Sequence, residues 1–223
     1  MKLLFENWRK YLLTEAAMTV DDLVDNEEIP GDRGLYILAK PSATGDGAVE
    51  LVYASVDRFG TPYVLGYDSP ISGEIEIAPH DEGEYAGHGP CHLAWQVKWS
   101  QVTDKWGPLL YDVAMEYATM WGHSHCEDGR KCGGLIADRE EVSSFARAVW
   151  DYYLGQRSDV DNYQLDDLEN TLTPDIDEDN CDQYVAGLGG KYHWPDNSLS
   201  KRYTKQPTTI NKLIELGRFI DQT

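Results

Sequence analysis

Apolar side chains recur at helical spacing in two stretches in the middle of the chain. In the first, which follows Gly107-Pro108, they are Leu109, Leu110, Val113, Ala114, Tyr117, Ala118 and Trp121. In the second, which Asp138 and Glu141 open as a capping-box-like pair, they are Val142, Phe145, Ala146, Val149, Trp150 and Tyr153. Residues three and four apart share one helix face, so both stretches predict amphipathic helices packed on an apolar surface.

A short apolar run, Leu135–Ala137, lies between the two predicted helices, and its length fits a buried strand. A strand directly before the first helix is predicted by the alternating residues Leu93, Trp95, Val97 and Trp99. The segment Val97–Tyr153 therefore predicts strand, tight turn, helix, strand and helix. Such a unit places the turn against a helix N-terminus, where ligands with phosphates tend to bind.

Further strands are predicted over 35–39, 49–56, 63–66, 74–77 and 198–205, with a hairpin turn over 42–47. Thr208 and Thr209 cap a predicted C-terminal helix whose apolar face is Ile210, Leu213, Ile214, Gly217 and Ile220. Antiparallel strands that precede a strand–helix–strand–helix unit predict the α/β (α+β) class. We expect a mixed, largely antiparallel sheet with flanking helices, plus an N-terminal and a C-terminal helix.

The amino-acid composition changes along the chain and predicts a linker, a domain and an acidic loop within that domain. Residues 16–34 are acidic and contain Pro30-Gly31, which predicts a linker or surface loop. Residues 35–223 are predicted to form a single domain. Within it, residues 159–182 hold ten Asp or Glu side chains, which predicts a solvated acidic loop.

The net charge of −20 disfavours direct nucleic-acid binding, because a strongly acidic protein repels the phosphate backbone at long range. No apolar run approaches the ~20 residues needed to span a bilayer, so no membrane partner is expected. The four cysteines are too sparse to predict a disulfide scaffold, and a cytoplasmic protein is the simplest interpretation.

Residues 1–15 predict a short amphipathic helix with Leu4, Trp8, Tyr11 and Leu12 on one side. This segment resembles the capsid-targeting leaders of proteins packaged into the heads of large tailed phages. Those leaders end at a prohead-protease site of the form Leu/Ile-x-Glu, which here matches Leu13 to Glu15 followed by Ala16. The resemblance implies cleavage after Glu15, contacts with phage head or scaffold proteins through residues 1–15, and a location in the head interior. The alternative is a terminal helix packed on the domain.

The order of predicted elements is similar to that of the Gcn5-related N-acetyltransferase (GNAT) family. In that family, the turn after a splayed strand presents backbone N–H groups to the pyrophosphate of acyl-CoA. The family turn has the form Arg/Gln-x-x-Gly-x-Gly/Ala, and Gly107 takes its last position while Ser143-x-x-Ala146 covers a later Asn-x-x-Ala. The resemblance thus implies an acyl-CoA site formed by Val97, Lys98, Trp99, Val102, Lys105, Trp106, Gly107 and Ser143.

Three positions depart from the family pattern. Val102 stands at the Arg/Gln position, Lys105 stands at the earlier glycine, and Trp150 stands where the family places a tyrosine that protonates the leaving thiolate. Tyr152 and Tyr153 are the nearest tyrosines to that position. The attacking amine must lose a proton, which a carboxylate or a water chain should accept. The candidate carboxylates are the strand-borne Glu74 and Glu76, with Asp104 beside the turn.

A His/Cys-rich insert separates the first predicted helix from the next strand. Its potential metal ligands are His123, His125, Cys126 and Cys132, and a second group of His88, Cys91 and His92 precedes the splayed strand. Imidazole and thiolate are the ligands that zinc prefers, so the insert predicts a zinc site, and the two groups could converge because they flank the same helix. The alternative is a polar loop in which Cys126 and Cys132 pair under oxidation.

Three functions remain in competition at this level. The first is a GNAT-like acyltransferase of a tailed phage that transfers an acyl group from acetyl-CoA or another acyl-CoA to an amine of a protein or small molecule, in the host cytoplasm or the virion. The second is a non-catalytic virion or head-internal protein with a transferase-like fold. The third is a zinc-stabilised interaction module.

Overall fold

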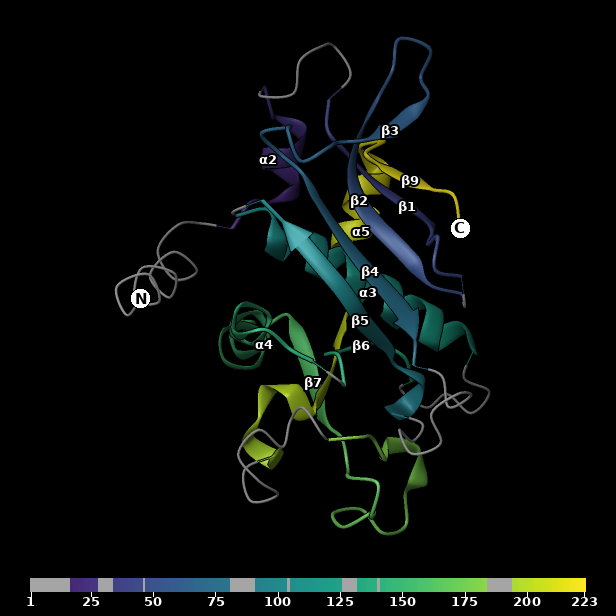
Figure 1. Ribbon diagram of the computed structural model, residues 1–223, viewed down its shortest axis with the longest axis vertical. Helices are drawn as coiled ribbons and strands as arrows, with labels where there is room; N and C mark the ends of the chain where they lie inside the picture. Colours follow the sequence, from purple (N-terminus) through teal and green to yellow (C-terminus); the bar gives the residue numbers. More distant parts are fainter. Residues whose placement is uncertain are drawn as a thin grey trace, which may run out of the picture. The chain divides into compact units, whose positions relative to one another are not determined.

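The computed structural model describes residues 17–27, 34–45, 47–80, 91–103, 105–125, 132–139, 141–183 and 194–223 (Figure 1). The helices in these ranges are α2 (Val20–Val24), α3 (Gly107–His125), α4 (Ser144–Gln156) and α5 (Thr208–Glu215). The strands are β1 (Tyr36–Pro41), β2 (Val49–Val56), β3 (Pro62–Val64), β4 (Gly73–Pro79), β5 (Trp95–Val102), β6 (Leu135–Ile136), β7 (Val160–Gln164), β8 (Lys201–Lys205) and β9 (Phe219–Asp221). Short 3-10 turns are η1 (Cys91–Leu93), η2 (Asp177–Asp179), η3 (Trp194–Asp196) and η4 (Ser198–Ser200).

The strands form a mixed sheet in the order β7-β8-β6-β5-β4-β2-β1-β9, with β3 paired to β2. The pairs β1–β2, β2–β3, β6–β8 and β7–β8 are antiparallel, whereas β5–β6 and β1–β9 are parallel. A mostly antiparallel sheet combined with helices confirms the predicted mixed α/β (α+β) class.

The described residues form two compact units. The first comprises the described parts of Met1–Glu76, Trp99–Val113 and Thr208–Thr223, and the second those of Ile77–Lys98 and Ala114–Pro207. The boundaries fall within β4, β5 and α3, so these three elements contribute residues to both units. The organisation of residues 35–223 as one domain stays a prediction.

In the first unit, β1 and β2 form the predicted hairpin, in register from Tyr36↔Ala54 to Pro41↔Val49. Both strands are largely buried, and Tyr53 lies fully inside, where its hydroxyl donates a hydrogen bond to the carbonyl of Trp106, 2.8 Å away. The rings of Tyr53 and Trp106 also meet edge to face with centroids 5.4 Å apart. This pair therefore fixes the residue before α3 to the hairpin.

The predicted acidic linker contains the short helix α2. Thr19 caps α2, since its hydroxyl accepts from the N–H of Asp22 while the Asp22 carboxylate accepts from the N–H of Thr19. Val20 and Leu23 are buried, and Asp21 pairs with Lys212 of α5. A buried apolar pair and a capping box outweigh the acidic composition, so this part of the chain is a docked helix instead of a surface loop.

The C-terminal helix is shorter than its apolar pattern predicts. Gly217 adopts φ 64°, and its N–H bonds to the carbonyl of Ile214 while the N–H of Arg218 bonds to that of Leu213. These two bonds are a Schellman motif, which ends a helix. Gly217 and Ile220 therefore do not belong to the helical face, and the chain continues into β9, which pairs parallel with β1.

In the second unit, aromatic rings pack against one another in two groups. The fully buried Trp95 meets Tyr117 and Trp121 edge to face, with centroids 5.8 and 5.3 Å apart. Trp150 of α4 stacks on Tyr203 of β8 at 5.2 Å, and both are buried. These contacts explain the apolar faces predicted for both central helices.

Two further boundaries in the second unit differ from the sequence prediction. The second central helix begins at Ser144, because the hydroxyl of Ser143 accepts from the N–H of Ala146, and Asp138 lies outside the helix. The predicted acidic loop contains β7, whose polar sequence gave no strand signal but which pairs with β8 from Val160↔Lys205 to Gln164↔Lys201.

The parallel pairing of β5 and β6 involves the first two residues of β5 and both residues of β6. The register pairs are Trp95↔Leu135 and Gln96↔Ile136, while β5 continues to Val102. Within the described residues, most of β5 therefore runs on without a β6 partner, and α3 starts five residues beyond its end at Gly107.

Candidate functional site

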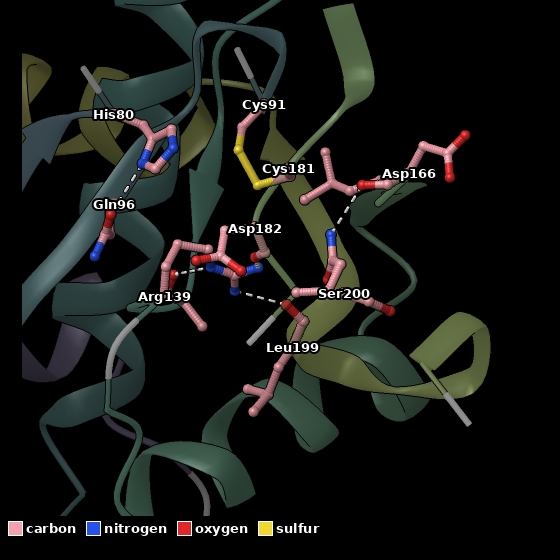
Figure 2. Close-up of a disulfide and its surroundings, with 12 residues drawn as sticks. His80, Cys91, Gln96, Arg139, Asp166, Cys181, Asp182, Leu199 and Ser200 are labelled. Carbon is pink, nitrogen blue, oxygen red and sulfur yellow. Dashed lines mark hydrogen bonds between the residues drawn. A yellow bond between two sulfur atoms is a disulfide. The ribbon is translucent and has the colours of Figure 1, made fainter. Parts of the chain in front are cut away.

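His80, Cys91 and Cys181 meet in the second unit, although they are far apart in the sequence (Figure 2). Cys91 and Cys181 form a disulfide that joins residues 90 apart, with their Cα atoms 4.8 Å from each other. A ring nitrogen of His80 and both sulfurs lie within 4.8 Å of one another. Imidazole and thiolate are ligands of zinc sites, so with its two cysteines reduced this group could hold a metal ion.

The sulfurs lie in an apolar pocket of the core. Both cysteines are fully buried and pack with Ala94, Ile136 and Leu165. His80 is also buried, with 8% of its surface exposed. The three side chains therefore stand in a low-dielectric environment, where a charged thiolate is stable only beside a positive charge or a metal ion.

Cys91 is presented by an unusual backbone. Cys91, His92 and Leu93 have φ values of 44°, 55° and 53°, so η1 is a left-handed turn made by non-glycine residues. Each such residue costs roughly 1–2 kcal/mol. Hydrogen bonds hold the turn in place: the N–H of Cys91 donates to the carbonyl of Asn180 at 3.0 Å, and the N–H of Gly133 donates to that of His92 at 3.0 Å.

The tautomer of His80 follows from its hydrogen-bond partners. The amide nitrogen of Gln96 donates to a carboxylate oxygen of Asp138 at 3.1 Å, so the Gln96 oxygen faces His80. That oxygen lies 3.0 Å from Nδ1 of His80 and can only accept, so Nδ1 carries the proton. The ring lone pair is then on Nε2, and Figure 2 shows the ring edge opposite the Gln96 bond turned toward the disulfide.

Cys181 is held by the acidic segment. Its N–H donates to the carbonyl of Asp166 at 2.9 Å, and the N–H of Asp166 donates to the carbonyl of Asp179. The Asp166 carboxylate accepts from the N–H groups of Leu172 and Thr173 at 2.8 and 2.7 Å. Burial raises the pKa of Asp166, but these and neighbouring hydrogen bonds outweigh it, and the net pKa is lowered.

Asp179 shows the opposite balance. Burial is the largest influence and raises its pKa, and the nearby charge of Asp166 adds to the increase. The hydroxyl of Thr173 lies between the two carboxylates, 2.9 Å from each. The acidic segment is therefore an internally hydrogen-bonded scaffold behind Cys181, and is more than a solvated loop.

Arg139 ties three segments together behind the cluster (Figure 2). Its guanidinium is 1% exposed and donates to the backbone carbonyls of Ala137, Asp182 and Leu199 at 3.0, 3.3 and 2.6 Å. Burial lowers the pKa of Arg139 to about 10, and the charges of Asp182 and Asp138 oppose that shift. Because Asp182 follows Cys181, this cation anchors the chain directly beside the second sulfur.

The predicted His/Cys insert lies mostly outside what the structure describes. This applies to Cys126, to His88 and to the side chains of His123 and His125. Cys132 is disulfide-bonded and so offers no thiolate in this state. Cys91 of the second predicted group belongs to the cluster, but with Cys181 and His80 as partners, neither of which the spacing indicated.

The turn between β5 and α3 lies in the first unit. Trp106 is buried, Lys105 is exposed with φ 72°, and its carbonyl accepts from the N–H of Met18 at 3.1 Å. A side chain added at Gly107 would meet nothing within 4 Å, so open space adjoins the first turn of α3. Helix starts leave N–H groups outside the helical pattern and carry a positive dipole end, which together favour an anion.

The remaining residues of the predicted acyl-CoA site take several roles. Val102 packs against Gly73 in the first unit, where Trp99 is 41% exposed. Val97 is buried and Lys98 exposed in the second unit, where Ser143 caps α4.

The predicted catalytic residues also differ in environment. Burial raises the pKa of Glu74, with a further increase from the charge of Glu50. Glu76 accepts a hydrogen bond from the Thr44 hydroxyl at 2.8 Å. In α4, Tyr153 is fully buried under the guanidinium of Arg157, whereas Tyr152 is half-buried.

The predicted processing residues Leu13, Glu15 and Ala16, and the carboxylate of Asp104, lie outside the described residues. Within the described part of the chain, every helix is too short or too polar to cross a bilayer. A comparison of this chain with protein-family models, with curated proteins and with solved structures finds no match.

Proposed function

We propose that this protein is a GNAT-like acyltransferase of a tailed phage, which transfers an acetyl or other acyl group from acyl-CoA to an amine. The observation that carries the proposal is the junction of β5 and α3. Within the described ranges, strand β5 pairs with β6 through Trp95 and Gln96 alone, and the chain then turns into a long helix at Gly107. A strand that extends beyond its parallel neighbour and leads into a helix N-terminus is an arrangement similar to that of the GNAT family.

The start of α3 suits the pyrophosphate of acyl-CoA in three respects. Gly107 leaves space for an anion to approach the backbone, Pro108 pre-forms the first turn, and Trp106 is locked against Tyr53. Lys105 is exposed beside this turn, and its positive charge favours an anion there. The glycine missing from the family motif at position 105 is replaced here by a lysine that still adopts the positive φ a glycine would favour.

The proton transfers can be assigned among the predicted residues. Glu74 is the better general base, because its pKa is raised toward neutral pH. Glu76 already accepts a hydrogen bond from the hydroxyl of Thr44. Tyr152 is the better acid for the departing thiolate, because Tyr153 is fully enclosed in the core. The acceptor is an amine of a host protein or a small molecule, met in the host cytoplasm or after delivery from the phage head.

Calorimetry with acetyl-CoA tests the proposal. Gly107→Asp places a carboxylate where the pyrophosphate is expected, while an acidic residue at a helix start stabilises the helix. We expect binding by the natural protein and at least a tenfold weaker affinity in this variant. Gly66→Asp is the matched control, since a side chain there also meets nothing within 4 Å. Absence of binding at millimolar acetyl-CoA, or equal affinities in both variants, contradicts the proposal.

A non-catalytic virion or head-internal protein is the second candidate, and one observation favours it. Trp150, which stands at the family's tyrosine position, is buried and stacked on Tyr203 as part of the core. Under this alternative residues 1–15 direct the protein into the phage head. Mass spectrometry of purified virions distinguishes the cases, because a mature N-terminus at Ala16 supports packaging and an intact Met1 argues against it.

A zinc-stabilised module is the third candidate. The observation that favours it is the cluster of His80, Cys91 and Cys181, which takes the place of the predicted insert as the candidate zinc site. Zinc suits this ligand set because it accepts both imidazole and thiolate. Elemental analysis of the protein purified under reducing conditions checks for stoichiometric zinc.

A further inference from the structure

The backbone around the cluster holds both cysteines in place independently of the bond between their sulfurs. The N–H of Cys91 bonds to Asn180 and that of Cys181 bonds to Asp166. Arg139 fixes the residue that follows Cys181 through its bond to the Asp182 carbonyl. Breaking the disulfide therefore leaves two thiols facing each other, with His80 beside them.

The distances are close to those that a metal ion needs. The three ligand atoms lie within 4.8 Å of one another. Around a tetrahedral zinc ion, with bonds of about 2.0 Å to nitrogen and 2.3 Å to sulfur, ligand atoms lie about 3.5–3.8 Å apart. Side-chain movements of about one ångström thus convert the disulfide geometry into a metal site.

The histidine is prepared for coordination. Nδ1–H donates to Gln96, and Gln96 is in turn fixed by Asp138, so the lone pair stands on Nε2. Metal-bound histidines almost always have such a partner on the other ring nitrogen, because it fixes the tautomer and the ring orientation. A hydrogen-bonded chain of the buried His80 and Gln96 with the half-buried Asp138 thus ends at two sulfurs, an arrangement that suits a metal ion.

From these observations we propose that the reduced protein binds zinc through His80, Cys91 and Cys181, and that the disulfide is the oxidised, metal-free form of the same site. Three protein ligands leave the fourth position of the zinc ion to water. The site is independent of acyl-CoA binding, so the two proposals can fail separately.

The redox step balances with a dithiol as reductant. The dithiol supplies two electrons and two protons, the bond between the cysteine sulfurs breaks to give two thiols, and the dithiol becomes a disulfide. Zinc then binds the two thiolates and displaces their protons. In the absence of metal, a disulfide oxidant takes up two electrons and two protons from the two thiols, becomes a dithiol, and the bond between Cys91 and Cys181 forms again.

The experiment uses the full chain, reduced with a phosphine, which is itself oxidised to the phosphine oxide with oxygen from water. The variant Cys126→Ser/Cys132→Ser removes the competing thiols of the predicted insert and keeps the cluster. We expect it to bind one zinc ion when reduced and none when oxidised, and to give thiolate-to-metal charge-transfer bands with cobalt.

His80→Gln is the variant that separates coordination from folding, because it keeps both cysteines and their disulfide. We expect zinc affinity to fall at least tenfold while the disulfide still forms on oxidation. Cys91→Ser/Cys181→Ser should lose the bound ion altogether. The proposal is overturned if the reduced Cys126→Ser/Cys132→Ser protein binds no zinc, if the oxidised protein binds it equally well, or if His80→Gln leaves the affinity unchanged.

Discussion

The turn between β5 and α3 and the cluster around Cys91 are built in opposite ways. The turn is a continuous piece of chain, anchored by one aromatic pair, Trp106 on Tyr53, and it presents backbone groups beside open space. The cluster draws its side chains from three separate segments, is fully buried at both sulfurs, and rests on a strained left-handed turn. A contiguous site is robust because local structure forms it, whereas a site assembled from distant segments depends on the fold around it.

The two regions should therefore be stabilised by different interactions. The turn relies on apolar packing, so truncating its anchor should be costly. The cluster relies on a covalent bond and on polar networks, so its stability should respond to redox state and pH. Four changes test the contrast, beginning with the largest expected effect.

Truncating the aromatic anchor of the turn should be the most destabilising. Trp106 is 3% exposed, and Trp106→Ala removes its ring from Tyr53 and leaves a cavity. We expect a loss of about 3–5 kcal/mol in the free energy of unfolding. Trp99→Ala is the control, because Trp99 is 41% exposed, and it should cost less than about 1 kcal/mol. Equal losses in urea unfolding would mean that Trp106 does not anchor the turn.

Removing the disulfide should be next. The bond closes a sequence separation of 90 residues, so Cys91→Ser/Cys181→Ser should lower the free energy of unfolding by about 2–4 kcal/mol under oxidising conditions. Under reducing conditions with a chelator present, the natural protein has neither bond nor metal and should match the variant. A stability difference that survives reduction and chelation would show that the serines act through something other than the lost bond.

Much of the fold was predictable from the sequence, because local patterns carry it. Strand β2 has its predicted bounds, and α3 starts where Gly107-Pro108 indicate. The misses have physical reasons: β7 is polar on most of its residues, β9 follows a glycine stop that looks like part of a helical face, and the acidic composition of α2 hides a capping box.

The candidate metal site was not predictable in the same way. Four cysteines allow three pairings, and the spacing indicates only the neighbours Cys126 and Cys132, so a bond between Cys91 and Cys181 followed by elimination and from no motif of its own. His80 lies at the end of a strand without any motif around it. These residues come together through contacts between distant segments, such as the hydrogen bond from the N–H of Cys91 to the carbonyl of Asn180, so the cluster is a property of the tertiary structure.

The acidic scaffold behind Cys181 should give the cluster its pH dependence. The folded-state pKa of Asp166 is lowered from its ordinary 3.8, so the unfolded chain takes up the proton first as the pH falls. Its contribution is thus present above about pH 4 and is lost as the pH falls through the folded-state pKa.

Replacing the two acidic residues should therefore have unequal effects. Asp166→Asn should cost about 2 kcal/mol at pH 7 through its lost charged hydrogen bonds, and less at pH 3. Asp179→Asn is the matched control, because a raised pKa makes the Asp179 charge unfavourable in the folded state, and this variant should be neutral or stabilising at pH 7. Urea unfolding at several pH values measures both, and a larger loss from Asp179→Asn would reverse the assignment.

The smallest change expected concerns the amide that orients His80. Gln96→Leu keeps the size of the side chain but removes the acceptor for Nδ1–H, so the imidazole loses the partner that fixes its tautomer. Outer partners of metal-bound histidines are typically worth 10–100-fold in affinity, and we expect about a tenfold weaker zinc affinity in the reduced protein. Disulfide formation on oxidation should be unaffected, because it does not involve the ring. If zinc affinity is retained in Gln96→Leu but lost in His80→Gln, His80 binds the ion without the hydrogen bond to Gln96. The cluster then depends less on the surrounding fold than the comparison with the turn implies.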